Sequence, residues 1–173
     1  MLQVLIVDDE QVERDGMKAI LQKSFPSLVL HEAMNGKMAV EMARNIEPEL
    51  ILIDIKMPGM NGLEAFEKII AHLPNTKFIM ITAYDTYEYM RRALKLGAID
   101  YILKPSKTND IIETVGKVLK QIVVEKKERA KNKTQQELLK KTIAVMEADV
   151  VTQLLFEHIH EVHLDILVAS ISS

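Results

Sequence analysis

The stretch Leu50-Ile51-Leu52-Ile53-Asp54 is the part of the sequence that decides the fold. Four consecutive large apolar residues without polar alternation are typical of a parallel strand that is buried on both faces. Four further short apolar runs occur in the first 120 residues, at positions 4–7, 28–30, 78–81 and 101–103. The sequence therefore predicts five short strands that share one sheet.

The segments between these runs have the spacing of amphipathic helices. Apolar residues recur three or four positions apart, as at Leu63, Phe66 and Ile70, and Pro or Gly residues mark the gaps. Strict alternation of strands and helices predicts an α/β domain, a doubly wound five-stranded parallel sheet with helices on both faces. In such sheets the functional site lies outside the carboxyl ends of the strands.

The composition excludes several classes of protein. Of 173 residues, 48% are hydrophobic and 27% are charged, and the formal net charge is −3, which indicates a globular protein without a strong basic field. Because there is no Cys, a disulfide scaffold, a catalytic thiolate and a Cys-ligated metal site are excluded. The N-terminus lacks the basic region of a secretory signal, and no apolar run approaches about 18 residues. We therefore expect a cytoplasmic protein without membrane contact.

Polar side chains stand where four of the predicted strands end. Asp8 and Asp9 follow the first strand, Asp54 the third, Thr82 the fourth and Lys104 the fifth. Each of them alone has a plain structural explanation as a turn or loop residue, but their joint position at one sheet edge favours a site. Three neighbouring carboxylates repel one another, and an all-oxygen ligand set favours Mg²⁺. The pattern predicts phosphoryl chemistry with a carboxylate as nucleophile.

Four motifs in this order resemble the receiver domain of two-component response regulators, over about residues 1–120. They are VLIVDDE (4–10), LIDIKMPGMNG (52–62), ITAY (81–84) and GAIDYILKP (97–105). The resemblance implies a flavodoxin-like (βα)5 fold with strand order 2-1-3-4-5. It also implies a signalling protein that is switched by phosphorylation.

The resemblance assigns the binding and acceptor roles residue by residue. Asp54 would be the phospho-acceptor. Mg²⁺ would be held by Asp9 directly, by Asp8, by Asp54 and by the main-chain carbonyl of Lys56. Lys104 would pair with the phosphoryl group, and the bond from Lys104 to Pro105 is the usual site of a cis peptide in this family.

The resemblance also implies a switch and partners. Thr82 would move to meet a phosphoryl oxygen, and Tyr101 would be the aromatic residue that rotates with it. The expected partners are a sensor histidine kinase and, after phosphorylation, a second copy of the chain. The protein would not be an enzyme with turnover, although Asp54 would take part in its own phosphorylation and dephosphorylation. Residues 83–89, AYDTYEY, resemble AraC-type (YesN-like) regulators, so DNA would be bound only through an output domain that is absent from this chain.

Other functions remain as alternatives. An aspartyl-phosphate phosphatase would want an Asp-x-Asp pair after a strand, and Asp8-Asp9-Glu10 lacks that spacing. A dinucleotide-binding oxidoreductase would need a Gly-rich turn after the first strand, where Asp8 and Asp9 stand instead. A receiver-like binding module that works without phosphate is the remaining alternative, and the intact set of site residues disfavours it.

Residues 121–173 have a different character and are expected to form a helical linker and the start of a truncated further region. Positions 125, 129, 132 and 136 interrupt the apolar helical seam with polar residues, and apolar residues return at Leu139, Ile143, Met146 and Val150. The segment is either a solvated linker or a dimerising helix. Residues 162–171 alternate imperfectly, and we expect a first strand there. His160 and His163 are expected to be exposed rather than metal ligands.

Overall fold

The first part of the chain consists of five strands that alternate with helices. The computed structural model describes the backbone of residues 1–83 and 87–171 and the side chains of residues 1–82 and 91–153. The elements are β1 (Gln3–Val7), α1 (Gln11–Ser24), β2 (Val29–Ala33), α2 (Gly36–Ile46), β3 (Leu50–Asp54), α3 (Gly62–Ile70), β4 (Lys77–Ala83), α4 (Tyr87–Lys95), β5 (Asp100–Lys104) and α5 (Thr108–Ile171). The predicted α/β alternation is confirmed.

The five strands form one parallel sheet in the order β2-β1-β3-β4-β5, as expected. The register pairs Val7 with Ile53, Asp54 with Ile81, and Ala83 with Lys104. These pairings bring the carboxyl ends of β1, β3, β4 and β5 to the same edge of the sheet.

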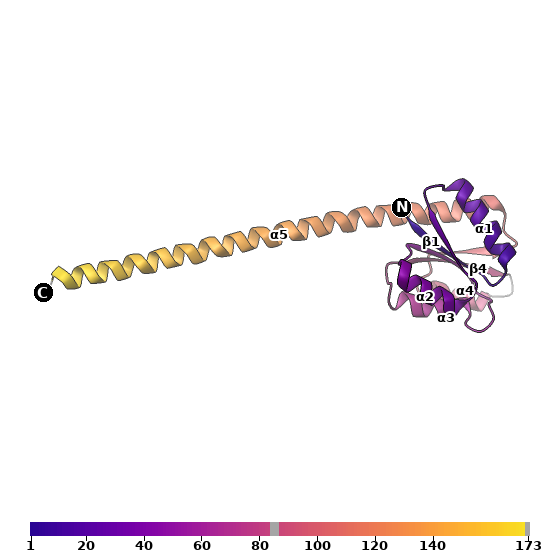
Figure 1. Ribbon diagram of the computed structural model, residues 1–173, viewed down its shortest axis with the longest axis horizontal. Helices are drawn as coiled ribbons and strands as arrows, with labels where there is room; N and C mark the ends of the chain where they lie inside the picture. Colours follow the sequence, from indigo (N-terminus) through magenta and orange to yellow (C-terminus); the bar gives the residue numbers. More distant parts are fainter. Residues whose placement is uncertain (84–86, 172–173) are drawn as a thin grey trace. The chain divides into compact units, whose positions relative to one another are not determined.

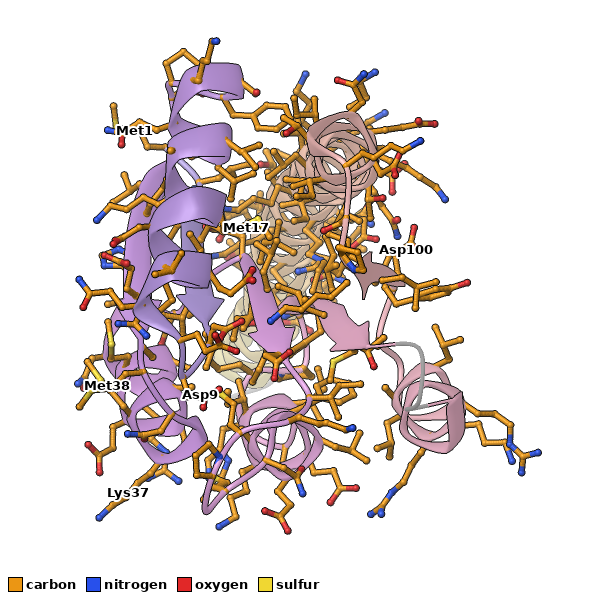
Figure 2. All side chains as sticks on the ribbon, turned by 90° about the vertical axis from the view of Figure 1, so that its right-hand side faces the viewer. Met1, Asp9, Met17, Lys37, Met38 and Asp100 are labelled. Carbon is orange, nitrogen blue, oxygen red and sulfur yellow. The ribbon has the colours of Figure 1, made fainter. Side chains whose placement is uncertain are left out.

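Two apolar clusters cover the two faces of the sheet. One contains buried residues of α2, α3 and α4, and the other contains buried residues of α1 and the first turns of α5. In Figure 1, α2, α3 and α4 lie on the side of the sheet opposite to α1. In Figure 2, Met17 points from α1 into the second cluster, which also contains Ile111 and Val115 of α5. Burial of each such side chain contributes about 1.5–3 kcal/mol.

Strand β3 lies at the centre of the sheet and contains the continuous apolar run of residues 50–53. Ile51 and Ile53 belong to one cluster, whereas Leu50 and Leu52 belong to the other. All five residues of the strand are buried, because helices cover both faces. The continuous apolar run is therefore what a central parallel strand requires.

The segment after β3 is fixed by a helix cap and by a close backbone contact. Asn61 and Glu64 form a capping box at the start of α3, with the Glu64 amide donating to Asn61 Oδ1 at 2.9 Å. The Gly62 amide donates to the Ile55 carbonyl at 3.0 Å. A Cβ atom at Gly62 would overlap the Asp54 carbonyl oxygen, so only Gly fits here.

The chain divides into two compact units, Met1–Val124 and Glu125–Ser173. Helix α5 begins in the first unit, where Ile111, Val115, Val118 and Ile122 are buried. The expected strand over residues 162–171 is wrong, because this segment belongs to α5. Alternation alone was weak evidence there, and a single strand without a partner would leave its backbone groups unpaired.

Within residues 1–83 and 87–171, the structure holds no helix with the length and hydrophobicity that crossing a bilayer requires.

Candidate functional site

Four strand ends place the candidate residues at one edge of the sheet. Asp8 follows β1 directly, Asp54 ends β3, and Lys104 ends β5. Thr82 is the residue before the last of β4 and is paired in register with Leu103, the neighbour of Lys104. The prediction that these residues share one edge is consistent with this register.

Lys104 bridges two buried carboxylates. Its Nζ lies 2.7 Å from Asp8 Oδ2 and 3.2 Å from Asp54 Oδ1. The side chains of Asp8 and Asp54 are only 4% and 9% exposed, and that of Lys104 is 23% exposed. One ammonium group therefore contacts two carboxylates in a largely buried place, where charge-assisted hydrogen bonds are strong.

The environment changes the pKa of both kinds of group. Burial raises the pKa of Asp54 to about 6 from an ordinary 3.8, and the charge of Asp8 adds to the rise, while Lys104 and the Lys56 amide oppose it. Burial acts to lower the pKa of Lys104, but its hydrogen bond with Asp8 and the two carboxylate charges together raise it. At neutral pH the site therefore holds an ionised Asp54 beside a firmly protonated lysine.

Asp9 and Lys56 occupy the rim of this site. Asp9 is exposed beyond the end of β1, where Figure 2 labels it, and the Lys56 side chain is also exposed. The turn between β1 and α1 is ordered around Asp8, whose Oδ1 accepts a hydrogen bond from the Glu10 amide at 2.9 Å. Asp9 thus stands next to the buried pair without being buried itself.

Thr82 and Tyr101 differ in their exposure. Thr82 is 2% exposed, and Tyr101 is 36% exposed on edge strand β5, where it pairs with Met80, two register pairs before the pair of Thr82 with Leu103. Their proposed motion remains a prediction. The AYDTYEY motif at residues 83–89 lies outside the side chains that the structure describes.

The donor set fits a hard divalent cation. Within the described side chains, no three acidic, His or Cys residues form a ready-made metal group. Instead, Asp8 and Asp54 converge on the Lys104 ammonium group, and Asp9 stands at the rim. Oxygen ligands of this kind suit Mg²⁺, which would be held by Asp8, Asp9, Asp54 and the Lys56 carbonyl. Mg²⁺ binding stays a prediction.

Two further features border the ion pair. The peptide bond from Lys104 to Pro105 is cis, as the resemblance implies. A cavity of about 420 Å³ opens beside the site, and its lining includes Asp8, Lys104, Val12 and Met17. Val12 is 82% exposed, so this side of α1 presents an apolar residue close to the strand ends.

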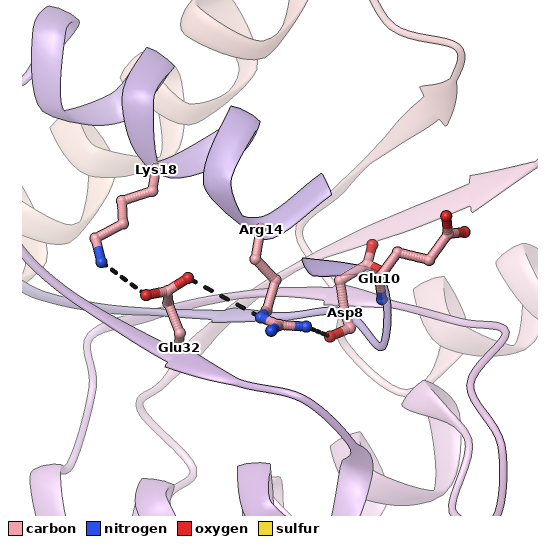
Figure 3. A network of polar contacts seen from close by, with 5 residues as sticks. All are labelled: Asp8, Glu10, Arg14, Lys18 and Glu32. Atoms are coloured by element: carbon pink, nitrogen blue, oxygen red, sulfur yellow. Dashed lines mark hydrogen bonds and ion pairs between the residues drawn. The ribbon is translucent and has the colours of Figure 1, made fainter. Parts of the chain in front are cut away.

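Sequence reasoning missed Arg14 as a residue of this region. Arg14 Nη1 donates a hydrogen bond to the main-chain carbonyl of Asp8 at 2.8 Å, and Glu32 and Lys18 continue the network (Figure 3). No sequence motif could have indicated the role of Arg14. Its hydrogen-bond partner is a main-chain oxygen, and its ion-pair partner Glu32 lies on β2, 18 positions further along the chain.

Comparisons with known proteins agree with this geometry. Residues 4–116 match the model of the response regulator receiver domain. YdfI of Bacillus subtilis, a transcriptional regulatory protein, is 34% identical over 162 residues, covering 86% of this chain and 75% of YdfI. The uncharacterized transcriptional regulatory protein YesN of the same organism is 33% identical, covering 70% of this chain and 33% of YesN.

A solved structure shares both sequence and fold. The REC domain of AraT, a response regulator from Geobacillus stearothermophilus, is 33% identical with a TM-score of 0.66, covering 72% of this chain and 98% of that chain. The chain spans only about a third of YesN and about half of several other curated relatives. The strand order, the acidic pair after β1, the buried Asp54 and the match over residues 4–116 lead to one conclusion: the chain belongs to the response regulator receiver domain family of two-component systems.

Proposed function

We propose that this chain receives a phosphoryl group on Asp54 from a sensor histidine kinase and passes the signal to an attached output domain. The observation that carries the proposal is the buried Asp54 carboxylate at the end of β3, with Lys104 Nζ 3.2 Å away. Of the acids at this edge, Asp54 is the one at the end of the central strand, between Asp8 and Thr82.

The residues supply a route for the transfer. One carboxylate oxygen of Asp54 attacks the phosphorus, the P–N bond of the kinase phosphohistidine breaks, and the imidazole leaves with the bonding electrons. The Lys104 ammonium transfers its contact from Asp54 to a phosphoryl oxygen, and the Thr82 hydroxyl donates to another. Mg²⁺, when bound, neutralises charge on the phosphoryl oxygens. The product is an acyl phosphate on Asp54, which water later hydrolyses, so the chain is a substrate and a switch rather than an enzyme with turnover.

The downstream function is control of transcription. YdfI and YesN are named as transcriptional regulatory proteins, and this chain covers only part of each of them. We infer that DNA is bound by an output domain, AraC-type by the resemblance of residues 83–89, and that Thr82 and Tyr101 couple phosphorylation to dimerisation. A histidine kinase and a DNA target together imply a cytoplasmic protein.

Intact-mass spectrometry after incubation with acetyl phosphate tests the proposal. The wild type should gain one phosphoryl group with Mg²⁺ and none with EDTA. Asp54→Ala should gain none, whereas the control Asp100→Ala, which removes a half-buried acid of β5, should be labelled like the wild type. Unlabelled wild type, under conditions that label another receiver, would favour the binding module that works without phosphate.

A further inference from the structure

The turn between β1 and α1 is held by a chain of polar contacts that starts on α1 (Figure 3). Arg14 Nη1 donates to the Asp8 carbonyl at 2.8 Å, and Arg14 Nε lies 3.9 Å from Glu32 Oε1 on β2. Lys18, one helical turn further along α1, holds the other oxygen of Glu32 at 2.7 Å. The Arg14 side chain is only 14% exposed. Lys18 thus holds Glu32 beside the guanidinium group, and the charge of Glu32 favours the orientation in which Arg14 reaches the Asp8 carbonyl.

The contacts on either side of Asp9 define the shape of this turn. The Asp8 amide donates to the Ala33 carbonyl at 3.2 Å, and the Glu10 amide donates to Asp8 Oδ1 at 2.9 Å. Arg14 reaches the turn twice, because its own amide donates to the Glu10 carbonyl at 3.2 Å while its side chain binds the Asp8 carbonyl. The exposed Asp9 is therefore placed by its backbone, which these contacts hold in position.

We propose that Arg14 is a positioning residue of the phosphoryl-transfer site, because it fixes the backbone that presents Asp8 and Asp9 to a divalent cation. This inference rests on the proposed function, in which these carboxylates hold Mg²⁺. Residues behind metal ligands commonly change metal affinity by about 10–100-fold when they are replaced. Arg14 touches the carbonyl of one of the expected ligands, so it belongs to this class of residue.

Two physical effects of Arg14 on the cation have opposite signs. As a nearby positive charge, Arg14 weakens Mg²⁺ binding by repulsion, so its removal should tighten binding if charge alone matters. By holding the backbone of the turn, Arg14 strengthens Mg²⁺ binding, so the removal of Arg14 should weaken Mg²⁺ binding if this effect dominates. The low exposure of the Arg14 side chain and its contacts with the Asp8 carbonyl and Glu32 favour the second effect. A Lys at this position keeps the charge but has a single donor group, which cannot reproduce the fork that joins the Asp8 carbonyl to Glu32.

The first experiment measures Mg²⁺ affinity by NMR titration of backbone amides in the full chain. Arg14→Ala should bind Mg²⁺ about tenfold more weakly than the wild type, and Arg14→Lys should also bind more weakly despite its retained charge. The matched control is Arg92→Ala, which removes an exposed Arg–Glu pair of 2.7 Å between α4 and α3 and should leave the affinity unchanged. Equal or tighter binding by Arg14→Ala would overturn the proposal.

The second experiment needs no metal. In EDTA, the amide hydrogens of Asp8 and Glu10 should exchange with solvent at least several-fold faster in Arg14→Ala than in the wild type. Unchanged exchange rates would contradict the idea that Arg14 holds the backbone of this turn. Should Arg14→Ala fail to fold, Glu32→Gln provides a second variant, since it weakens the support of the guanidinium group. It should shift both measurements in the same direction, and no shift in either would refute the inference.

Phosphorylation kinetics separate this inference from the proposed function. With acetyl phosphate, Arg14→Ala should need about tenfold more Mg²⁺ for half its maximal rate, while the rate at saturating Mg²⁺ stays near that of the wild type. A variant that was merely less well folded would lose rate at every Mg²⁺ concentration. If the wild type itself is not labelled, the proposed function fails, yet Mg²⁺ affinity and amide exchange still decide the role of Arg14.

Discussion

Replacing Asp54 with Asn should make the first unit more stable at neutral pH and leave its stability unchanged near pH 4. The substitution keeps the shape of the side chain and an oxygen that accepts from the Lys56 amide. It also leaves the 2.7 Å contact between Lys104 and Asp8 in place. The substitution removes a buried negative charge. Contacts within the folded protein stabilise this charge less well than water does in the unfolded chain.

The magnitude follows from the pKa of Asp54, which burial raises from 3.8 to about 6. The unfolded chain loses this proton near the lower value and the folded chain near the upper one. Between them the folded state binds more protons, so the free energy of unfolding falls as the pH rises from about 4 to 6. At about 1.4 kcal/mol per pKa unit, the ionised Asp54 costs up to about 3 kcal/mol above pH 6.

Urea denaturation in EDTA at several pH values measures this effect. All four tyrosines lie between residues 84 and 101, so tyrosine fluorescence reports on the first unit rather than on residues 125–173. Glu41→Gln on α2 is the matched control, because it removes an equal charge from an exposed position and should change stability by less than about 0.5 kcal/mol. A stability gain for Asp54→Asn that is equally large at pH 4 and pH 7.5, or absent at both, would refute the reasoning.

Three further substitutions have defined outcomes in the same assay. Lys104→Met keeps the aliphatic stem but leaves two buried carboxylates without their cation, so the protein should lose about 2–4 kcal/mol at pH 7; equal stability would show that water already screens the pair. Gly62→Ala forces a methyl group against the Asp54 carbonyl and should cost about 2–3 kcal/mol and slow labelling by acetyl phosphate, and normal labelling would contradict this. Glu47→Gly should add about 0.5–1 kcal/mol, because Glu47 ends α2 with φ at +44°, a conformation that favours Gly; a loss of stability would oppose this explanation.

The buried centre of the sheet could be predicted from the sequence, but the edge strand β2 could only be approximated. The apolar run at 50–53 differs from β3 by one residue, because both faces of that strand are covered. At β2 the apolar run 28–30 overlaps only the first two residues of the observed Val29–Ala33 and leaves out the polar His31 and Glu32. An edge strand pairs on one side only and tolerates polar residues, so its hydrophobic signal is weaker.

The sequence predicted those site residues that directly follow or end a strand. It could not predict a residue whose hydrogen-bond partner is a main-chain atom. Asp8, Asp54 and Lys104 could be placed together because carboxyl ends of parallel strands meet. The contact of Arg14 with a main-chain carbonyl has no sequence signature. The strand prediction for residues 162–171 was wrong for another reason. A helix that has already formed extends through residues of moderate helix propensity, and the alternation of apolar residues does not reveal this.

The contact between Lys104 and Asp8 joins residues that are 96 positions apart in the chain. During synthesis, a ribosome therefore releases Asp8 and Asp54 before Lys104, since β5 is the last of the five strands of this sheet in chain order. A growing chain that ends before β5 holds the two carboxylates without the lysine that contacts both of them. The complete arrangement of two carboxylates around one ammonium group should thus form only when β5 docks on β4.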